Sequence, residues 1–156
     1  MESRARRAFP TRLFGRLNGK SIDIIQEDDK PPKYAFIGVR SCDLSAIAVQ
    51  DRVLLQGRYT DPIYQARRED CFIVAVNCGQ AGGARFCVSM KTGPKATFGF
   101  DLAMTEVLEG ERHYFVVEVG KERGLEAINE ITHCEAGDEE QARAEQIVAR
   151  TATQNS

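Results

Sequence analysis

The chain lacks several features that would assign it to a broad class. None of its apolar runs approaches the roughly 18 residues that a membrane-spanning helix requires. Its formal net charge of −2 leaves no basic excess, so nucleic acid is not expected as a partner. The basic start, Met1–Arg7, is not followed by the apolar core of a secretion signal. We therefore expect a soluble cytoplasmic protein.

Motifs that would identify a site directly are also missing. The glycine-rich segment Gly79–Gly83 matches neither the phosphate-binding pattern G-x-x-x-x-G-K-[ST] nor the dinucleotide pattern G-x-G-x-x-G. There is no C-x-x-C pair and no internal repeat. A nucleophilic Cys–His pair stays open, although nothing in the sequence places His113 or His133 beside a cysteine. Five cysteines in a cytosolic protein favour free thiols or metal ligands over disulfides.

Apolar patterning predicts an α/β fold. Two runs with little polar alternation are typical of strands covered on both faces, and helical spacing fills the segment between them. The predicted order of strand, helix, helix and strand is Tyr34–Val39, Asp43–Leu55, Pro62–Glu69 and Cys71–Val76. Ser41 or Asp43 can cap the first helix, and Asp61 followed by proline is a start signal for the second. We expect the first helix to pack on the sheet through Ile47 and Leu54.

The second half completes the predicted sheet with an antiparallel hairpin. Its strands are Phe98–Val107 and His113–Val119, and helices follow at Gly124–Thr132 and Glu139–Arg150. Asp138 is expected to cap the last helix, whose weak apolar stripe comprises Ala142, Ile147 and Val148. Ser21–Gln26 is a plausible edge strand. The prediction is one α/β domain over residues 21–150 with a mixed, partly parallel sheet flanked by helices, an irregular segment over 1–20 and a tail over 151–156.

Three cysteines follow predicted strand ends. Cys42 and Cys78 come just after the two buried strands, and Cys87 lies nine residues beyond Cys78. Open α/β sheets place their sites at the carboxyl ends of parallel strands, and thiolates select zinc, copper(I) or iron–sulfur clusters. The alternative is that Cys42 and Cys78 are small buried residues, as we expect for Cys71 inside its strand. Cys134, beside His133, fits a solvated turn.

Longer motifs carry a more specific signal. They are the strings Gly38-Val39-Arg40-Ser41-Cys42-Asp43-Leu44-Ser45-Ala46-Ile47, Val76-Asn77-Cys78, Phe86-Cys87-Val88-Ser89-Met90 with Thr92-Gly93-Pro94, and Gly99-Phe100-Asp101-Leu102-Ala103-Met104-Thr105-Glu106. In this order they resemble the iron–sulfur (4Fe-4S) β subunit of soluble hydrogenase and sulfhydrogenase complexes, a family that includes the corresponding iron–sulfur subunit of anaerobic sulfite reductases. The resemblance covers about residues 30–130.

The resemblance implies a cofactor and its ligands. In that family four cysteines of the α/β region suit one [4Fe-4S] cluster, and a ferredoxin-like domain follows. Cys42, Cys78 and Cys87 match three of the four, whereas Arg85 occupies the fourth position. An arginine cannot ligate iron, and its charge is expected to lower the pKa values of the thiols. The ferredoxin half is not present in this sequence, so the chain looks like a fragment or a degenerate member.

The expected function follows from this resemblance. We expect an electron-transfer subunit domain of a hydrogenase- or sulfite-reductase-like complex, an oxidoreductase subunit without independent turnover. Its partners would be the flavin and catalytic subunits of that complex. A cofactor-free interaction module that docks redox partners is the alternative, and a thiol enzyme is a third possibility.

Overall fold

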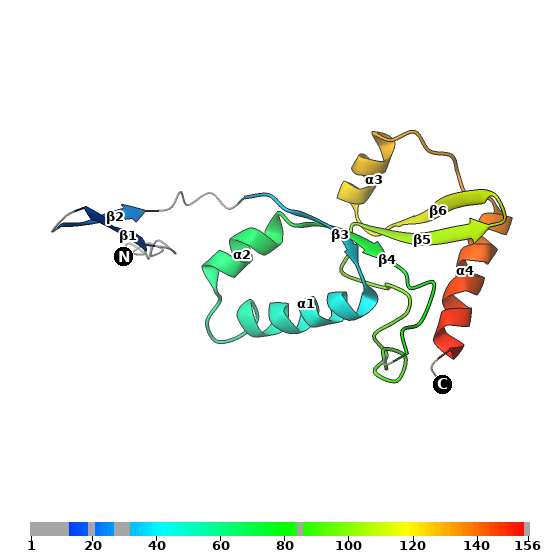
Figure 1. The fold of residues 1–156 in the computed structure, drawn as a ribbon, viewed down its shortest axis with the longest axis horizontal. Coiled ribbons are helices and arrows are strands. Elements are labelled where there is room, and N and C mark those ends of the chain that lie inside the picture. Colours follow the sequence, from blue (N-terminus) through cyan, green and yellow to red (C-terminus); the bar gives the residue numbers. More distant parts are fainter. Residues whose placement is uncertain (1–12, 19–20, 27–31, 84–85, 155–156) are drawn as a thin grey trace, which may run out of the picture.

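The structure, a computed structural model, describes residues 13–18, 21–26, 32–83 and 86–154. Its main sheet has the strand order β3-β4-β5-β6, formed by Ala35–Val39, Phe72–Val76, Leu102–Glu109 and Arg112–Val119. The first three strands are parallel, and β6 pairs with β5 in antiparallel register. The helices are α1 (Ser41–Leu54), α2 (Pro62–Glu69), α3 (Glu122–Asn129) and α4 (Asp138–Thr153). The predicted α/β class with a mixed sheet is confirmed (Figure 1).

Local sequence signals explain where α2 and the hairpin form. The Asp61 carboxylate accepts hydrogen bonds from the backbone N–H groups of Ile63 and Tyr64, at 2.9 and 3.0 Å, and Pro62 is the first residue of α2. A two-residue connection, Gly110-Glu111, joins β5 to β6, and Gly110 adopts a φ of +59° that glycine accepts without strain. The start of α2 and the hairpin are confirmed, but the first strand of the hairpin begins at Leu102 and not at Phe98.

The starts of α1 and α4 differ from the prediction. α1 begins at Ser41, and the Asp43 carboxylate accepts a 3.0 Å hydrogen bond from the backbone N–H of Arg40, the residue that precedes the helix. The cap position of α4 is Gly137, which brings Asp138 into the first helical turn. Asp138 is therefore not the cap, but its charge still complements the positive end of the helix dipole.

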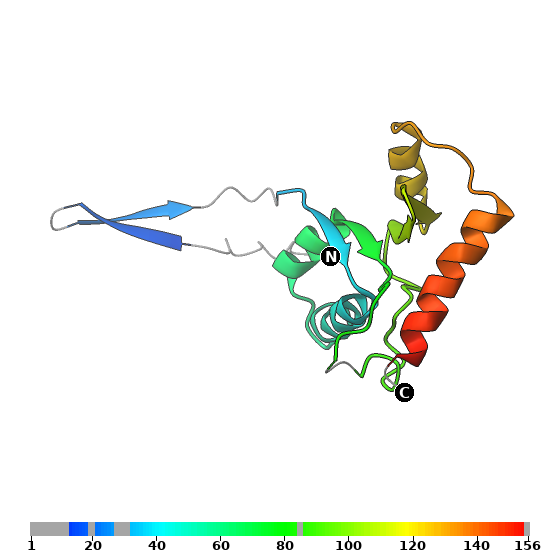
Figure 2. The ribbon, with the colours of Figure 1, turned by 45° about the vertical axis from the view of Figure 1, so that its right-hand side comes forward.

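Two apolar clusters stabilise one face of the sheet. Ile73 and Ala75 of β4 and Ala103 of β5 alternate along their strands, so they share a face and pack with Leu44 of α1. The second cluster joins Val107 and Val116 to Ala144 of α4. α1 therefore packs on β4 through Leu44, and α4 packs on the β5–β6 hairpin through Ala144. The two helices lie to either side of the carboxyl ends of the parallel strands (Figures 1 and 2).

Two predicted packing residues are not in the core. Leu44 is buried and Ile47 is packed beside it, whereas Leu54 is only half-buried and is not part of either cluster. On α4, Ala142 is exposed and Ala144 is buried in its place. The predicted face of α1 is correct, although its far end lies outside the two clusters, whereas on α4 the position of Ala142 lies about half a turn from that of the buried Ala144.

The expectation that β3 is buried on both faces is wrong. β3 forms one edge of the sheet, and its Phe36 and Ile37 side chains are 51% and 75% exposed. Gly38, with a φ of +87°, lies at a register shift between Ile37 and Val39. This bulge turns Val39 toward the first cluster, so only the last residue of the strand packs inward.

The two ends of the chain also differ from the prediction. Residues 13–18, expected to be irregular, form β1 (Leu13–Asn18), which pairs with β2 (Ser21–Gln26) in a separate antiparallel sheet. This hairpin lies apart from the main sheet in both views (Figures 1 and 2). The predicted tail is helical as far as Thr153, because Thr151 is buried and its hydroxyl donates to the Ile147 carbonyl at 2.9 Å. Among the helices that the structure describes, none is long and apolar enough to span a membrane.

Candidate functional site

The connection between β4 and β5 carries two of the three candidate cysteines. The described residues of this connection between parallel strands contain no helix, and the buried Asn77 side chain fixes its course. The Asn77 Oδ1 accepts a 2.7 Å hydrogen bond from the Ala96 N–H, and its Nδ2 donates to the Thr105 hydroxyl at 2.9 Å. Asn77 thus ties the start of the connection to its far end and to β5.

The same connection brings Cys87 to the start of α1. The Ser41 hydroxyl donates to the Lys95 carbonyl at 2.8 Å. A Cβ placed on Gly93 would lie 3.5 Å from the Cβ of Ser41 and 3.6 Å from that of Cys87, so Gly93 lies between the two segments. The Cys42 and Cys87 thiols are close enough to interact, since Cys87 raises the pKa of the Cys42 thiol. The structure therefore brings together two of the three cysteines that the resemblance singles out.

Cys78 lies on the other side of this loop. Its backbone N–H donates to the Pro94 carbonyl at 3.1 Å, so it is anchored to the segment that also contacts Cys87. Across the described residues, however, no three His, Cys, Asp or Glu side chains are grouped to hold a metal ion. The donor set is thus a pair of thiols, with Cys78 anchored by its backbone to the same loop, and it falls short of a closed ligand shell. Arg85 lies outside the described residues.

The remaining cysteines have other surroundings. Cys71 is buried in the first apolar cluster, as predicted for a core residue. Cys134 is exposed, as is His133, in keeping with the expected solvated connection.

The predicted direction of the thiol pKa shift is wrong for Cys42. Burial raises the pKa of the Cys42 thiol, and the neighbouring Asp43 carboxylate and Cys87 thiol raise this pKa further. Burial likewise raises the pKa of Cys71. A lowered pKa was expected from the charge of Arg85 alone, whereas burial and the carboxylate of Asp43, adjacent to Cys42 in the sequence, act in the opposite direction. Ligation of metal by Cys42 would therefore have to displace a firmly held proton.

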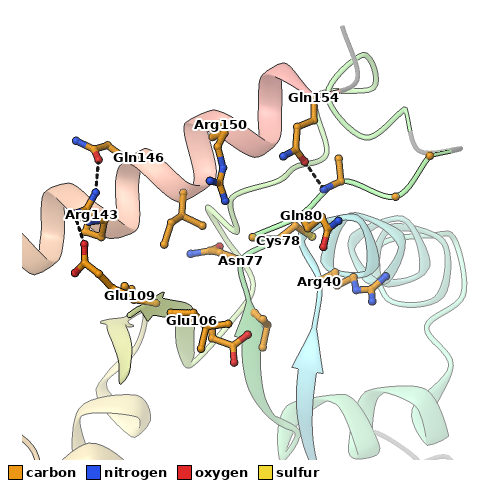
Figure 3. Close-up of a pocket in the computed structure, with 18 residues that line it drawn as sticks. Arg40, Asn77, Cys78, Gln80, Glu106, Glu109, Arg143, Gln146, Arg150 and Gln154 are labelled. Atoms are coloured by element: carbon orange, nitrogen blue, oxygen red, sulfur yellow. Dashed lines mark hydrogen bonds and ion pairs between the residues drawn. The ribbon is translucent and has the colours of Figure 1, made fainter. Parts of the chain in front are cut away.

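A large cleft adjoins the cysteines at the carboxyl ends of the parallel strands (Figure 3). Its volume is about 1160 Å³, and it lies between the segment Asn77–Gly83, the end of β5 and the last turns of α4. Cys78 lines this cleft, whereas Cys42 and Cys87 do not. The polar side chains on its walls are Arg40, Asn77, Gln80, Glu106, Glu109, Arg143, Gln146, Arg150 and Gln154.

The α4 side of this cleft was not found from the sequence. Arg143, Arg150 and Gln154 lie on a helix whose polar face is typical of solvent exposure, so their residue types gave no functional signal. The Ala81 N–H donates to the Gln154 side-chain oxygen at 2.9 Å, which connects the end of α4 to the glycine-rich segment. No sequence signal locates them, because it is the burial of Ala144 and Thr151 in the folded chain that orients the helix.

Fold and site together describe an α/β domain with a cysteine-bearing loop at the carboxyl edge of its sheet. No protein-family model matches the chain, and no solved structure matches it. Among curated proteins, the chain is similar to sulfhydrogenase 2 subunit beta of Pyrococcus furiosus, with 35% identity over 104 residues. The similarity covers 67% of this chain but only 29% of the relative, so the chain spans less than a third of the length of that protein.

Proposed function

We propose that this chain is a domain of the hydrogenase β-subunit family and acts in electron transfer within a multi-subunit redox complex. The observation that carries the proposal is the similarity to a sulfhydrogenase β subunit, which covers two thirds of the chain. The fold supports it, because Cys42, Cys78 and Cys87 all lie around the loop at one end of the sheet. The partners would be other subunits of that complex, in the cytoplasm.

In this proposal Cys42, Cys78 and Cys87 hold an iron–sulfur cluster, which when bound supplies a one-electron redox centre. The chain contributes the positions of the thiols. Cys42 is held in the first turn of α1, and Cys87 is held against it through the contacts of Ser41 and Gly93. The fourth family position is Arg85, so the proposed cluster has three protein thiolates and an open fourth site.

Anaerobic expression followed by iron and sulfide analysis tests this proposal. The parent protein should contain both elements and show a broad visible absorption band. Cys42→Ser should lose most of the iron, whereas Cys134→Ser, which alters an exposed cysteine outside the loop, should retain it. Arg85→Cys supplies the missing thiolate and should hold iron more firmly than the parent.

A cofactor-free interaction module is the second candidate, and the edge strand β3 favours it. Phe36 and Ile37 are more than half exposed on a sheet edge that no described strand pairs with, where another chain can add a strand. Negligible iron in both the parent and Arg85→Cys would contradict the cluster proposal and leave this module as the better account.

A further inference from the structure

The charges of the cleft are unevenly distributed. On its β5 side, the Arg143 guanidinium pairs with the Glu109 carboxylate, and the Glu106 carboxylate lies 2.9 Å from the Nε2 of His113. On the other side lie Arg40, just after β3, and Arg150, on the last turns of α4 (Figure 3). Three arginines and two glutamates line the cleft, so it carries a net positive charge.

Two of these arginines are available to a ligand. Neither the Arg40 nor the Arg150 guanidinium has an ion-pair or hydrogen-bond partner among the described residues. Arg150 reaches from α4 toward Asn77 and Cys78 in Figure 3. A guanidinium presents a planar fork of N–H donors that matches a phosphate group with two parallel hydrogen bonds.

The glycine-rich segment supplies further donors on the same wall. The backbone N–H groups of Gly79 and Gln80 have no acceptor among the described residues, and both residues line the cleft. A Cβ on Gly79 would lie 3.5 Å from Ile147 Cγ2, so the segment packs directly on α4. Backbone amides beside basic side chains are a common arrangement for phosphate groups.

The size of the cleft decides between a free anion and a larger ligand. About 1160 Å³ is slightly above the range of typical small-molecule sites and far exceeds what inorganic phosphate fills. Half-buried Val76 and Ile147 offer apolar surface, and the Gln80 amide has no side-chain partner among the described residues. An open α/β sheet also binds its ligands beyond the carboxyl ends of its strands.

We propose that this cleft binds a nucleotide, with its phosphates on Arg150, Arg40 and the backbone N–H groups of Gly79 and Gln80 and its nucleoside against Val76 and Ile147. The cleft shares Cys78 with the proposed cluster, but the proposed nucleotide contacts involve none of the three thiols. Failure to find iron would therefore leave this proposal intact, and failure to bind a nucleotide would leave the cluster proposal intact.

Calorimetric titration of the whole chain with ADP and with pyrophosphate tests the proposal at physiological ionic strength. ADP should bind saturably and at least about tenfold more tightly than pyrophosphate, because only ADP places a nucleoside in the cleft. Arg150→Gln should weaken ADP binding about tenfold or more, the loss expected when one charge-assisted contact is removed. Arg150→Lys keeps the charge without the planar fork, so its affinity for ADP should lie between those of the parent and Arg150→Gln.

Arg52→Gln is the matched control. Arg52 lies on the exposed last turn of α1 outside the cleft, and its replacement changes the net charge by the same amount. Its ADP affinity should remain within about twofold of the parent, provided that far-ultraviolet circular dichroism shows all variants folded. The proposal is overturned by the absence of saturable ADP binding, by equal weakening in Arg52→Gln and Arg150→Gln, or by pyrophosphate binding as tightly as ADP.

Discussion

Asp101 offers the sharpest test of how this fold is stabilised. Its side chain is fully buried just before β5, and its Oδ2 accepts a 2.7 Å hydrogen bond from the Ile73 backbone N–H. Arg123 of α3 donates to both carboxylate oxygens and, at 2.7 Å, to the Cys71 carbonyl. The carboxylate therefore joins β4, β5 and α3. Replacement by asparagine keeps the shape but removes the charge and turns one acceptor into a donor.

The cost of Asp101→Asn follows from these contacts. The bond from the buried Ile73 N–H to a charged acceptor contributes about 1.5–3 kcal/mol. The ion pairs with Arg123 and Lys121 contribute less, about 0.5–1 kcal/mol each, because the two cationic side chains are 40% and 47% exposed. We expect a loss of roughly 3 kcal/mol in the free energy of unfolding, a substantial part of the 5–15 kcal/mol typical of a folded domain.

The pH dependence gives an independent signature. Burial alone would raise the pKa of Asp101, but the hydrogen bonds from Ile73 and Arg123 and the charges of Lys121 and Arg123 outweigh it and hold this pKa below its ordinary 3.8. A lowered folded-state pKa means that the stabilisation is fully present at pH values above 3.8 and is lost as the pH falls through the folded pKa. The difference between parent and variant should therefore be largest near neutrality and shrink in acid.

Urea unfolding followed by circular dichroism measures both quantities. The midpoint should fall in Asp101→Asn with an unchanged slope, and the two midpoints should converge in acid. Asp70→Asn, at an exposed position, is the control and should change stability by less than about 0.5 kcal/mol. Equal midpoints for parent and Asp101→Asn at neutral pH would refute the assignment of the carboxylate as a stabilising charge.

Two further predictions concern Tyr64 and Gly124. Burial raises the pKa of Tyr64, and the 2.7 Å hydrogen bond from its hydroxyl to Asp51 raises it further, to about 12. The stabilisation that the Tyr64 hydroxyl provides is therefore present below pH 10.0 and is lost as the pH rises through 12. Ultraviolet difference absorbance should show a phenolate step near pH 12 that is missing from Tyr64→Phe; its persistence in the variant would contradict the assignment. A Cβ at Gly124 would collide with the Asp101 carbonyl oxygen, so Gly124→Ala should cost at least about 2 kcal/mol in thermal or urea unfolding. Gly83→Ala, where a Cβ meets nothing, should be nearly neutral, and equal effects of the two substitutions would refute the close packing of α3 on Asp101.

The elements that could be predicted from sequence are those with local signals. Asp61 and Pro62 mark the start of α2 because a cap and a fixed φ need no information from distant residues. The β5–β6 hairpin is similar, since its two alternating runs flank Gly110. The exposure of β3 could not be predicted in this way. Its composition suits a buried strand, and only the pairing of the whole sheet shows that it lies at an edge.

The site was predicted only where local signals mark it, and its long-range contacts were not. Strand ends indicated Cys42 and Cys78, but the contact of Cys87 with Cys42 depends on Gly93 and Ser41, which meet only in the folded chain. The cleft joins residues near 80 to residues near 150, a separation that no motif spans. Asp101 belongs to one of the motifs that carry the resemblance, but nothing in the sequence showed that its buried carboxylate joins β4 to α3.

The long connection between β4 and β5 also bears on the order in which the chain can fold. The β5–β6 hairpin needs only a two-residue turn, and hairpins form within microseconds. Pairing β4 with β5 must first close the whole segment 77–101, and the entropy of that closure opposes it. Cys42 meets Cys87 only when β3, β4 and this segment are all in place. Proximity of these two thiols therefore requires closure of this segment, and before that closure each thiol is open to oxidation by itself.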